Sequence, residues 1–204
     1  MPDPIVFLVD DEEEVRSTLS RALTKRGFDV APFESARAFL DQYNQDQHGC
    51  LVLDYGMPDI NGLELQSLMN DTNLTLPIIF ISGHGGIPES VQAMKAGAVD
   101  FLEKPFRQAD LVACIHTAFE RDLKTREDMQ EQKTAKALFD RLTSREHEIA
   151  VFMIEHPSNT ASKEIGRALD ISPRTVDHHR ARILEKLEIG SVIELVELAQ
   201  KVRA

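Results

Sequence analysis

The sequence predicts an α/β domain with a doubly wound, five-stranded parallel sheet, followed by a small all-α domain. Three observations predict this architecture. Short apolar runs alternate with segments of helical periodicity through the first 120 residues. These runs are apolar throughout, as expected for strands covered on both faces of a sheet. The last third of the chain shows helical periodicity only. We expect domains at residues 1–121 and 139–204, joined by a connector at 122–138.

Five strand–helix units account for the first domain. The apolar runs predicted as strands are residues 5–9, 28–33, 50–54, 77–81 and 98–102. Gly27 and Gly97 are expected to end the first and fourth helices, and Ser35 can cap the second. The number and length of the units fit the flavodoxin-like strand order, in which the second strand lies at the edge of the sheet.

Composition limits the function classes. The net charge of -11 argues against generic nucleic-acid binding, but the excess acid is confined to the first domain: residues 1–120 hold 19 Asp/Glu against 8 Lys/Arg, and residues 138–204 hold 11 against 10. No apolar run approaches the roughly 20 residues that a membrane span needs, and the N-terminus lacks a signal-peptide profile. Cys50 and Cys114 lie beside apolar residues without metal-site spacing, so we expect reduced thiols in a cytoplasmic protein.

Polar residues follow the inner strands of the predicted sheet, at the edge where their carboxyl ends meet. They are Asp10, Asp11, Asp54, Ser82 and Lys104. Three carboxylates in one cleft raise each other's pKa values unless a cation lies among them, and Mg²⁺ suits such oxygen ligands. A hydroxyl and an ammonium are donors for phosphoryl oxygens. A carboxylate that attacks phosphorus would form an aspartyl phosphate.

Each of these residues also has a simpler interpretation when it is taken alone. Acids after the first strand often cap a helix and favour its dipole. Ser82 can be a turn residue, and Lys104 before a proline can be a solvated surface lysine. The five residues together at strand ends favour a functional site.

With Met57-Pro58, Gly62 and Lys104-Pro105-Phe106, these residues resemble the receiver domain of response regulators over roughly residues 1–121. The segments Gly83-His84-Gly85, 93–98 (AMKAGA) and 103–106 (EKPF) are similar to the NarL/FixJ branch in particular.

The resemblance implies a role for each residue. Asp54 would accept a phosphoryl group from a sensor histidine kinase. Asp11, Asp54 and the carbonyl of Gly56 would bind Mg²⁺ or another divalent cation such as Mn²⁺, with Asp10 nearby. Ser82 and Lys104 would hold the phosphoryl oxygens, Phe101 would be the switch aromatic, and the Lys104–Pro105 bond would be cis. Gly56 leaves room for water beside Asp54, so the lifetime of the phosphate stays open.

The connector is predicted as a helical continuation. An apolar stripe from about residue 109 to Phe119 gives way to an almost wholly polar segment of mixed charge that contains no helix breaker. Local charge pairs would stabilise it as an exposed helix. A flexible linker is the alternative.

The last third predicts four helices. Thr143 and Glu146 form a capping box for the first, and Ser162 can cap the second. Asp170-Ile171 makes a turn, after which Ser172 caps and Pro173 begins the third helix, which runs to about residue 188. Ser191 starts the last. Two helices joined by a tight turn and braced by two more form a helix-turn-helix, and a plain four-helix packing unit is the alternative.

Residues 175–187 (TVDHHRARILEKL), together with Leu142-Thr143, Arg145-Glu146 and residues 163–165 (KEI), resemble the LuxR-type DNA-binding domain over about 60 residues. A helical wheel places Val176, Arg180, Ile183 and Leu187 toward the core, so Arg180 is expected to be structural. The residues expected to contact DNA are Asp177, His178 and Ala181 at base edges, Arg174, Arg182 and Lys186 at phosphates, and Thr175 beside them.

The sequence therefore predicts a two-component response regulator rather than an enzyme, apart from the assistance the receiver gives to its own phosphorylation and dephosphorylation. Its expected partners are a sensor histidine kinase, operator DNA, a second copy on activation and RNA polymerase, with no membrane. A constitutive DNA binder whose receiver only dimerises is one alternative. An Asp-nucleophile phosphohydrolase is another, but that class needs a second acid where this chain has Gly56.

Overall fold

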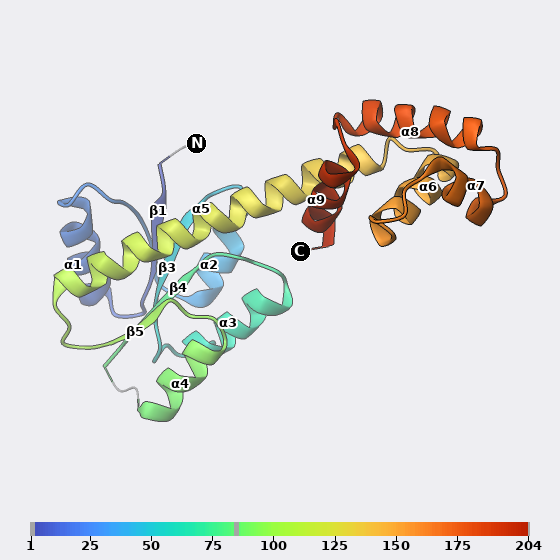
Figure 1. Cartoon of the computed structure of the whole chain (residues 1–204). Helices are drawn as coiled ribbons and strands as arrows, with labels where there is room; N and C mark the ends of the chain where they lie inside the picture. The colour runs from blue at the N-terminus through green and yellow to red at the C-terminus, as the bar shows by residue number, and fades with distance from the viewer. Residues whose placement is uncertain (1–2, 84–85, 204) are drawn as a thin grey trace. The chain divides into compact units, whose positions relative to one another are not determined.

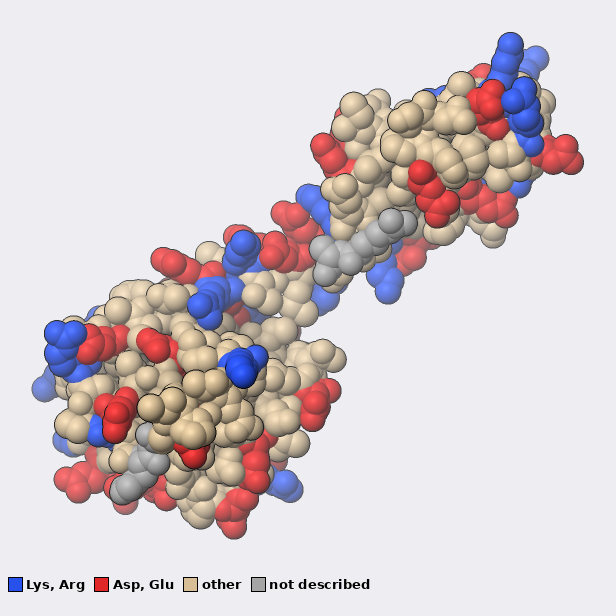
Figure 2. Space-filling model, turned by 60° about the horizontal axis from the view of Figure 1, so that its bottom comes forward, with Lys and Arg blue, Asp and Glu red and all other residues tan. Residues whose placement is uncertain are grey.

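The computed structural model describes residues 3–83 and 86–203. His84 and Gly85, which contribute to the resemblance above, lie outside the described residues. The chain divides into two compact units, residues 1–125 and 126–204, and each is described by itself. Figure 2 shows acidic and basic side chains interspersed on the visible face of each unit.

The first unit contains a five-stranded parallel sheet in the order β2-β1-β3-β4-β5 (Figure 1). The strands are β1 (Ile5–Val9), β2 (Asp29–Phe33), β3 (Gly49–Asp54), β4 (Ile78–Ser82) and β5 (Asp100–Glu103). This order confirms the predicted doubly wound fold, including the edge position of the second strand. β5 begins two residues later than predicted because the Ala98 amide still donates to the carbonyl of Ala93 at the end of the preceding helix.

Helices cover both faces of the sheet. They are α1 (Glu13–Thr24), α2 (Ala36–Gln42), α3 (Gly62–Asp71), α4 (Ile87–Lys95) and α5 (Gln108–Phe139). Val6 and Leu8 of β1 pack with α1 and α5, whereas Phe7 and Val9 pack with α2, α3 and α4. This alternation follows from the two-residue period of a strand, so both faces of β1 must be apolar.

Local signals place several of the helix ends. Ser35 caps α2 by accepting a hydrogen bond from the Ala38 amide, as predicted. Gly27 and Gly97 adopt positive φ angles after α1 and α4, a conformation that favours glycine. The Lys104–Pro105 peptide bond is cis, which also confirms the expectation.

The connector is helical: α5 is a single 32-residue helix, and the flexible-linker alternative is wrong. Its polar segment is not wholly exposed, however. Asp122 is buried and accepts a hydrogen bond of 2.9 Å from the Gly49 amide at the start of β3. Among the described helices, including α5, none is long and apolar enough to cross a membrane.

The second unit is helical and has its own core. It consists of the end of α5 and of α6 (Ser144–Glu155), α7 (Ser162–Leu169), α8 (Pro173–Leu187) and α9 (Val192–Arg203). Its buried residues include Ile149, Met153, Ile165, Val176, Ile183 and Leu195. Thr143 and Glu146 form the predicted capping box, and Ser172 caps α8 with Pro173 in its first turn.

One predicted cap is wrong. Ser162 is the first residue of α7, and Ala161 occupies the N-cap position without a side-chain hydrogen bond. The Ser162 hydroxyl instead donates to the carboxylate of Asp177 on α8. A contact with another helix therefore replaces the local cap.

Candidate functional site

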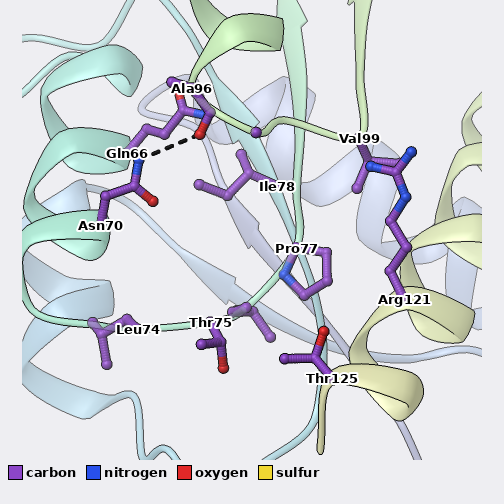
Figure 3. A pocket seen from close by; sticks show the side chains of 12 residues that line it. Gln66, Asn70, Leu74, Thr75, Pro77, Ile78, Ala96, Val99, Arg121 and Thr125 are labelled. Atoms are coloured by element: carbon purple, nitrogen blue, oxygen red, sulfur yellow. Dashed lines mark hydrogen bonds between the residues drawn. The ribbon is translucent and has the colours of Figure 1, made fainter. Parts of the chain in front are cut away.

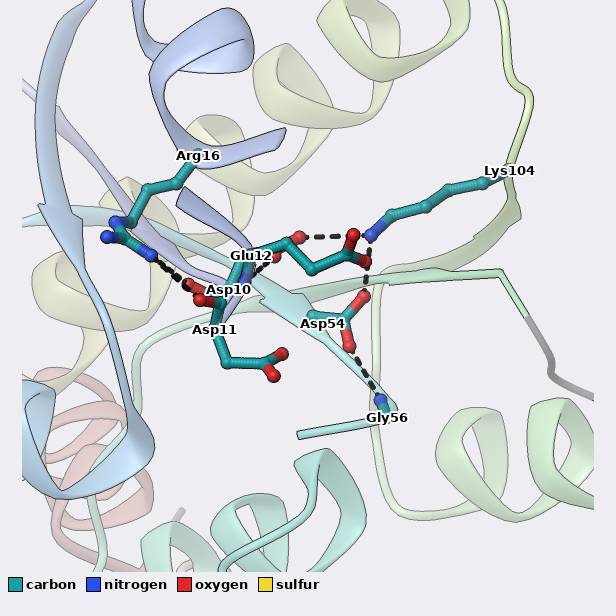
Figure 4. Close-up of polar contacts among 7 residues, drawn as sticks. All are labelled: Asp10, Asp11, Glu12, Arg16, Asp54, Gly56 and Lys104. Carbon is teal, nitrogen blue, oxygen red and sulfur yellow. Dashed lines mark hydrogen bonds and ion pairs between the residues drawn. The ribbon is translucent and has the colours of Figure 1, made fainter. Parts of the chain in front are cut away.

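The carboxyl edge of the sheet brings Asp54, Asp10 and Lys104 into direct contact (Figure 4). Asp54 is the last residue of β3, Asp10 follows β1, and Lys104 follows β5. The Lys104 ammonium lies 2.8 Å from Oδ1 of Asp54 and 3.0 Å from Oδ2 of Asp10. Three strands separated in sequence thus supply one polar cluster, which is the arrangement predicted for them.

Backbone groups fix the orientation of both carboxylates. Oδ2 of Asp54 accepts a hydrogen bond of 2.7 Å from the amide of Gly56, and Oδ1 of Asp10 accepts one of 2.9 Å from the amide of Glu12. Arg16 of α1 donates to the carbonyl of Asp10 at 2.7 Å. These bonds leave one oxygen of each carboxylate facing the Lys104 ammonium.

The electrostatics of the cluster follow from its burial. Asp10 is fully buried, and this burial raises the pKa of its carboxyl above the usual range, although the neighbouring ammonium opposes the shift. Burial alone would lower the pKa of Lys104, but its hydrogen bonds to Asp54 and Asp10 outweigh that effect and raise it. The two carboxylates therefore favour the charged form of the Lys104 ammonium that lies between them.

Asp11, the third predicted acid, is exposed, and Figure 4 shows its carboxylate beside the same edge without a hydrogen bond to the other labelled side chains. In the described part of the chain, no three His, Cys, Asp or Glu side chains are already gathered as a metal site. The donor set nevertheless fits a hard divalent cation. Three carboxylates lie at this edge of the sheet and only two of them contact the Lys104 ammonium, and Mg²⁺ takes only one or two carboxylates while it keeps several waters. Asp11, Asp54 and the Gly56 carbonyl are the groups that would hold it.

Ser82 and Phe101 lie next to the cluster. Ser82 ends β4, is buried, and accepts a hydrogen bond of 2.7 Å at its carbonyl from the amide of Lys104. Phe101 of β5 is half-buried, with its ring 6.3 Å from that of Tyr55 and 5.9 Å from that of Phe80. Movement of Ser82 is therefore coupled through the backbone to the segment that carries Lys104.

Two glycines shape the loop after Asp54. A Cβ atom at Gly62 would lie 2.7 Å from Phe80 and 2.8 Å from the Asp54 carbonyl, so this position requires glycine. A Cβ atom at Gly56 would lie 3.5 Å from Oδ2 of Asp54, which is an ordinary contact. Gly56 therefore leaves space beside the carboxylate that a larger side chain could fill.

The second unit presents a polar face along α8. The exposed residues on it are Arg174, Thr175, Asp177, His178, Ala181, Arg182 and Glu185. The opposite face buries Val176, Ile183 and Leu187, as the helical wheel predicts. Arg180 is structural, as predicted, because its guanidinium donates to the carbonyl of Thr160 at 2.8 Å.

Two residues predicted to contact DNA are engaged within the second unit. Asp177 accepts the hydrogen bond from Ser162. The Lys186 ammonium lies 2.6 Å from Oε2 of Glu146 on α6.

Glu146, which the sequence presents only as a helix cap, also joins α6 to α8. Its side chain is buried, and the same oxygen also accepts hydrogen bonds from the amide and the hydroxyl of Thr143. These contacts, with that of Lys186 the largest, lower the pKa of Glu146 to about 2. A Lys side chain 40 positions further along the chain gives no local signal of this contact.

Comparison with known proteins places both units in described families. Residues 6–116 match the response regulator receiver domain, and residues 140–199 match the bacterial regulatory proteins of the luxR family. The chain is 40% identical to the transcriptional regulatory protein FixJ of Rhizobium meliloti, over 98% of this chain and 96% of that protein. It is 38% identical to the response regulator protein TmoT of Ectopseudomonas mendocina, over 98% of this chain and 90% of that protein.

A solved structure agrees with this likeness. The response regulator StyR is 39% identical, with a TM-score of 0.84 over 98% of this chain and 99% of that chain.

Proposed function

Since the chain belongs to the NarL/FixJ-type response regulators, the two-component transcriptional regulators with a receiver domain and a LuxR-type DNA-binding domain, we propose that phosphorylation of Asp54 controls its binding to DNA. The observation that carries this proposal is the contact of the Lys104 ammonium with both Asp54 and the buried Asp10 at the carboxyl edge of the sheet. A phosphoryl group on Asp54 would bring its oxygens within reach of this ammonium.

Phosphoryl transfer would form one bond to phosphorus and break another. A carboxylate oxygen of Asp54 attacks the phosphorus of a phosphohistidine on the kinase, and the bond from phosphorus to the imidazole nitrogen breaks. The Lys104 ammonium turns from the Asp54 carboxylate to a phosphoryl oxygen, and the Ser82 hydroxyl donates to another. A divalent cation held by Asp11, Asp54 and the Gly56 carbonyl would neutralise charge on the phosphoryl oxygens. The receiver supplies positioning and charge, as it would for dephosphorylation, in which water attacks the phosphorus, the bond from phosphorus to the Asp54 oxygen breaks and inorganic phosphate leaves.

The phosphoryl group would shift a pre-existing equilibrium of the receiver. Because Ser82 and Lys104 are joined through the backbone, new bonds to the phosphate pull on both strand ends. Phe101, whose ring stacks on that of Phe80 and makes a tilted contact with that of Tyr55, then moves inward. We propose that this form dimerises, binds operator DNA and contacts RNA polymerase in the cytoplasm.

The DNA interface is proposed on the exposed face of α8. Arg174 and Arg182 would contact phosphates, and His178, Ala181 and Thr175 would lie at the bases. We propose that Asp177 and Lys186 position the helix instead of contacting DNA, because each already has a partner in its own domain. Two arginines give few phosphate contacts, so a dimer on a two-fold site is required for strong binding.

Incubation with Mg²⁺ and a small phosphodonor tests the first step. The full chain should be labelled, and Asp54→Asn should not. Asp59→Asn, the same change at an exposed acid five positions later, is the matched control and should be labelled like the wild type. Equal labelling of Asp54→Asn would overturn the proposal.

A further inference from the structure

Arg16 of α1 fastens the segment that carries two of the acids at the carboxyl edge of the sheet. Its Nη1 donates to the Asp10 carbonyl at 2.7 Å and to the Asp11 carbonyl at 3.3 Å. Figure 4 shows Arg16 and Lys104 on opposite sides of this segment. Lys104 therefore holds the Asp10 carboxylate from one side, and Arg16 holds the backbone from the other.

Asp11 differs from the other two acids in what holds it. The carboxylates of Asp10 and Asp54 each accept a hydrogen bond from a backbone amide and contact the Lys104 ammonium. Across the described residues, Asp11 has a single hydrogen bond, the one that its carbonyl accepts from Arg16. Because a short side chain with two torsion angles has few positions around its Cα, the place of the Asp11 carboxylate depends on the backbone that Arg16 holds.

The residues on either side of Asp11 are tied to regular structure. The Asp10 amide donates to the Phe33 carbonyl at the end of β2 at 3.3 Å, and the Glu12 carbonyl accepts a hydrogen bond of 2.9 Å from the Arg16 amide. The Arg16 side chain spans the short segment between these two points. One residue of α1 thus joins the start of its helix to the backbone that follows β1.

The charge of Arg16 has a simpler interpretation. Arg16 follows a run of five acids, residues 10–14, and its guanidinium could only offset their mutual repulsion. That interpretation and a positioning role predict opposite effects on a bound cation. A positive charge beside the cluster repels Mg²⁺, so its removal should tighten Mg²⁺ binding if charge alone matters. Loss of the two carbonyl hydrogen bonds should weaken Mg²⁺ binding if they place a ligand.

We infer that Arg16 is a positioning residue for the divalent cation and acts through the backbone of Asp10 and Asp11. The inference rests on the proposed function, because it takes the cation to be held by Asp11, Asp54 and the Gly56 carbonyl. Arg16 contacts neither the cation nor the phosphoryl group. It keeps the Asp11 carboxylate at the edge of the sheet before the cation binds. Removal of a group that orients a metal ligand commonly lowers metal affinity by about 10–100-fold.

Titration of the full chain with Mg²⁺, followed through the amide signal of Gly56, tests the inference. Arg16→Met should weaken Mg²⁺ binding about tenfold, although the variant is more negative than the wild type. Arg16→Gln also removes the charge and should weaken binding in the same direction. It takes the place of Arg16→Met if the amide spectrum shows that Arg16→Met does not fold.

Two arginines of the receiver serve as matched controls. Arg21 lies on the same helix, and its guanidinium donates to the Ser17 carbonyl of α1 at 3.2 Å. Arg121 lies on α5, and Figure 3 shows it with Val99, which precedes β5 at the opposite edge of the sheet from the cluster. Arg21→Met and Arg121→Met each remove one positive charge without touching the Asp11 backbone. Both should bind Mg²⁺ like the wild type.

The outcomes separate this inference from the proposed function. Mg²⁺ binding by Arg16→Met that is as tight as in the wild type, or tighter, would overturn the inference, because only the charge of Arg16 would then matter. An equal weakening in Arg21→Met or Arg121→Met would overturn it as well, since the effect would follow from the loss of any arginine. A wild type whose Gly56 signal does not respond to Mg²⁺ would instead contradict the cation site of the proposed function, on which the inference rests.

Discussion

The Lys186 ammonium on α8 lies 2.6 Å from Oε2 of Glu146, a carboxylate on α6 that is 1% exposed. The same oxygen caps the start of α6 through Thr143. One buried carboxylate thus joins the first helix of the DNA-binding domain to the helix proposed to read the bases.

Removal of Lys186 should destabilise the DNA-binding domain. Lys186→Met leaves the buried Glu146 carboxylate without its cation, and the free energy of unfolding should fall by roughly 3 kcal/mol. Arg141→Met is the matched control, because Arg141 pairs with Glu188 at the surface. This replacement should lower the free energy of unfolding by under about 1 kcal/mol. Urea unfolding followed by amide signals of the second unit measures both. Equal losses of unfolding free energy in the two variants would show that burial of Glu146 does not strengthen its ion pair with Lys186.

The Glu146 contact also predicts a dependence of stability on pH. The pKa of Glu146 falls from 4.5 to about 2 in the folded protein, chiefly through Lys186. Because the folded value is the lower one, the contribution to stability is complete above pH 4.5 and is lost as the pH falls through 2. Glu146→Gln should flatten the stability profile of the second unit in this window, whereas Glu148→Gln, at an exposed position, should not. A profile that is the same in Glu146→Gln and the wild type would contradict the assignment.

Lys104 should compete with a divalent cation for the acidic cluster. Lys104→Met leaves the buried Asp10 and Asp54 without an ammonium, so the variant should be less stable by roughly 3 kcal/mol without metal. Added Mg²⁺ should then raise its melting temperature more than that of the wild type, because ligand binding to the folded state stabilises it. Lys95→Met, at an exposed lysine of α4, should respond to Mg²⁺ like the wild type. An equal response of Lys104→Met would show that the metal does not lie in this cluster.

Gly56 should set the lifetime of the aspartyl phosphate. A Cβ atom there makes an ordinary contact with Oδ2 of Asp54, so a larger side chain fits and shields the carboxylate from water. Gly56→Met should lengthen the half-life of the labelled protein several-fold after removal of the phosphodonor. Gly83→Ala, where a Cβ atom has open space, should leave the half-life unchanged. A half-life in Gly56→Met equal to that of the wild type would show that water approaches from another side.

The strand-end cluster could be predicted because each of its members follows an apolar strand in the sequence. Parallel strands bring their carboxyl ends to one edge, so Asp10, Asp54 and Lys104 meet without any knowledge of side-chain conformations. The helical face of α8 followed in the same way from the period of a helix. Both inferences depend on backbone geometry alone.

Contacts that join distant helices could not be predicted. Ser162 stands at the start of an apolar helical segment and has the side chain of a helix cap. Its hydroxyl nevertheless donates to Asp177 on α8, the next helix along the chain. Asp122 lies in a charged segment and is buried because it reaches the Gly49 amide of β3. In each case a tertiary partner outweighs the local pattern, and no spacing in the sequence indicates that partner.

Control of dimerisation through Asp54 can be measured as the solution mass of the full chain in Mg²⁺ with and without beryllofluoride. We predict that the mass doubles when beryllofluoride is added to the wild type and to Asp59→Asn, and that it stays unchanged in Asp54→Asn. A mass that does not respond in the wild type, or that doubles in Asp54→Asn as well, would contradict control of this regulator through Asp54.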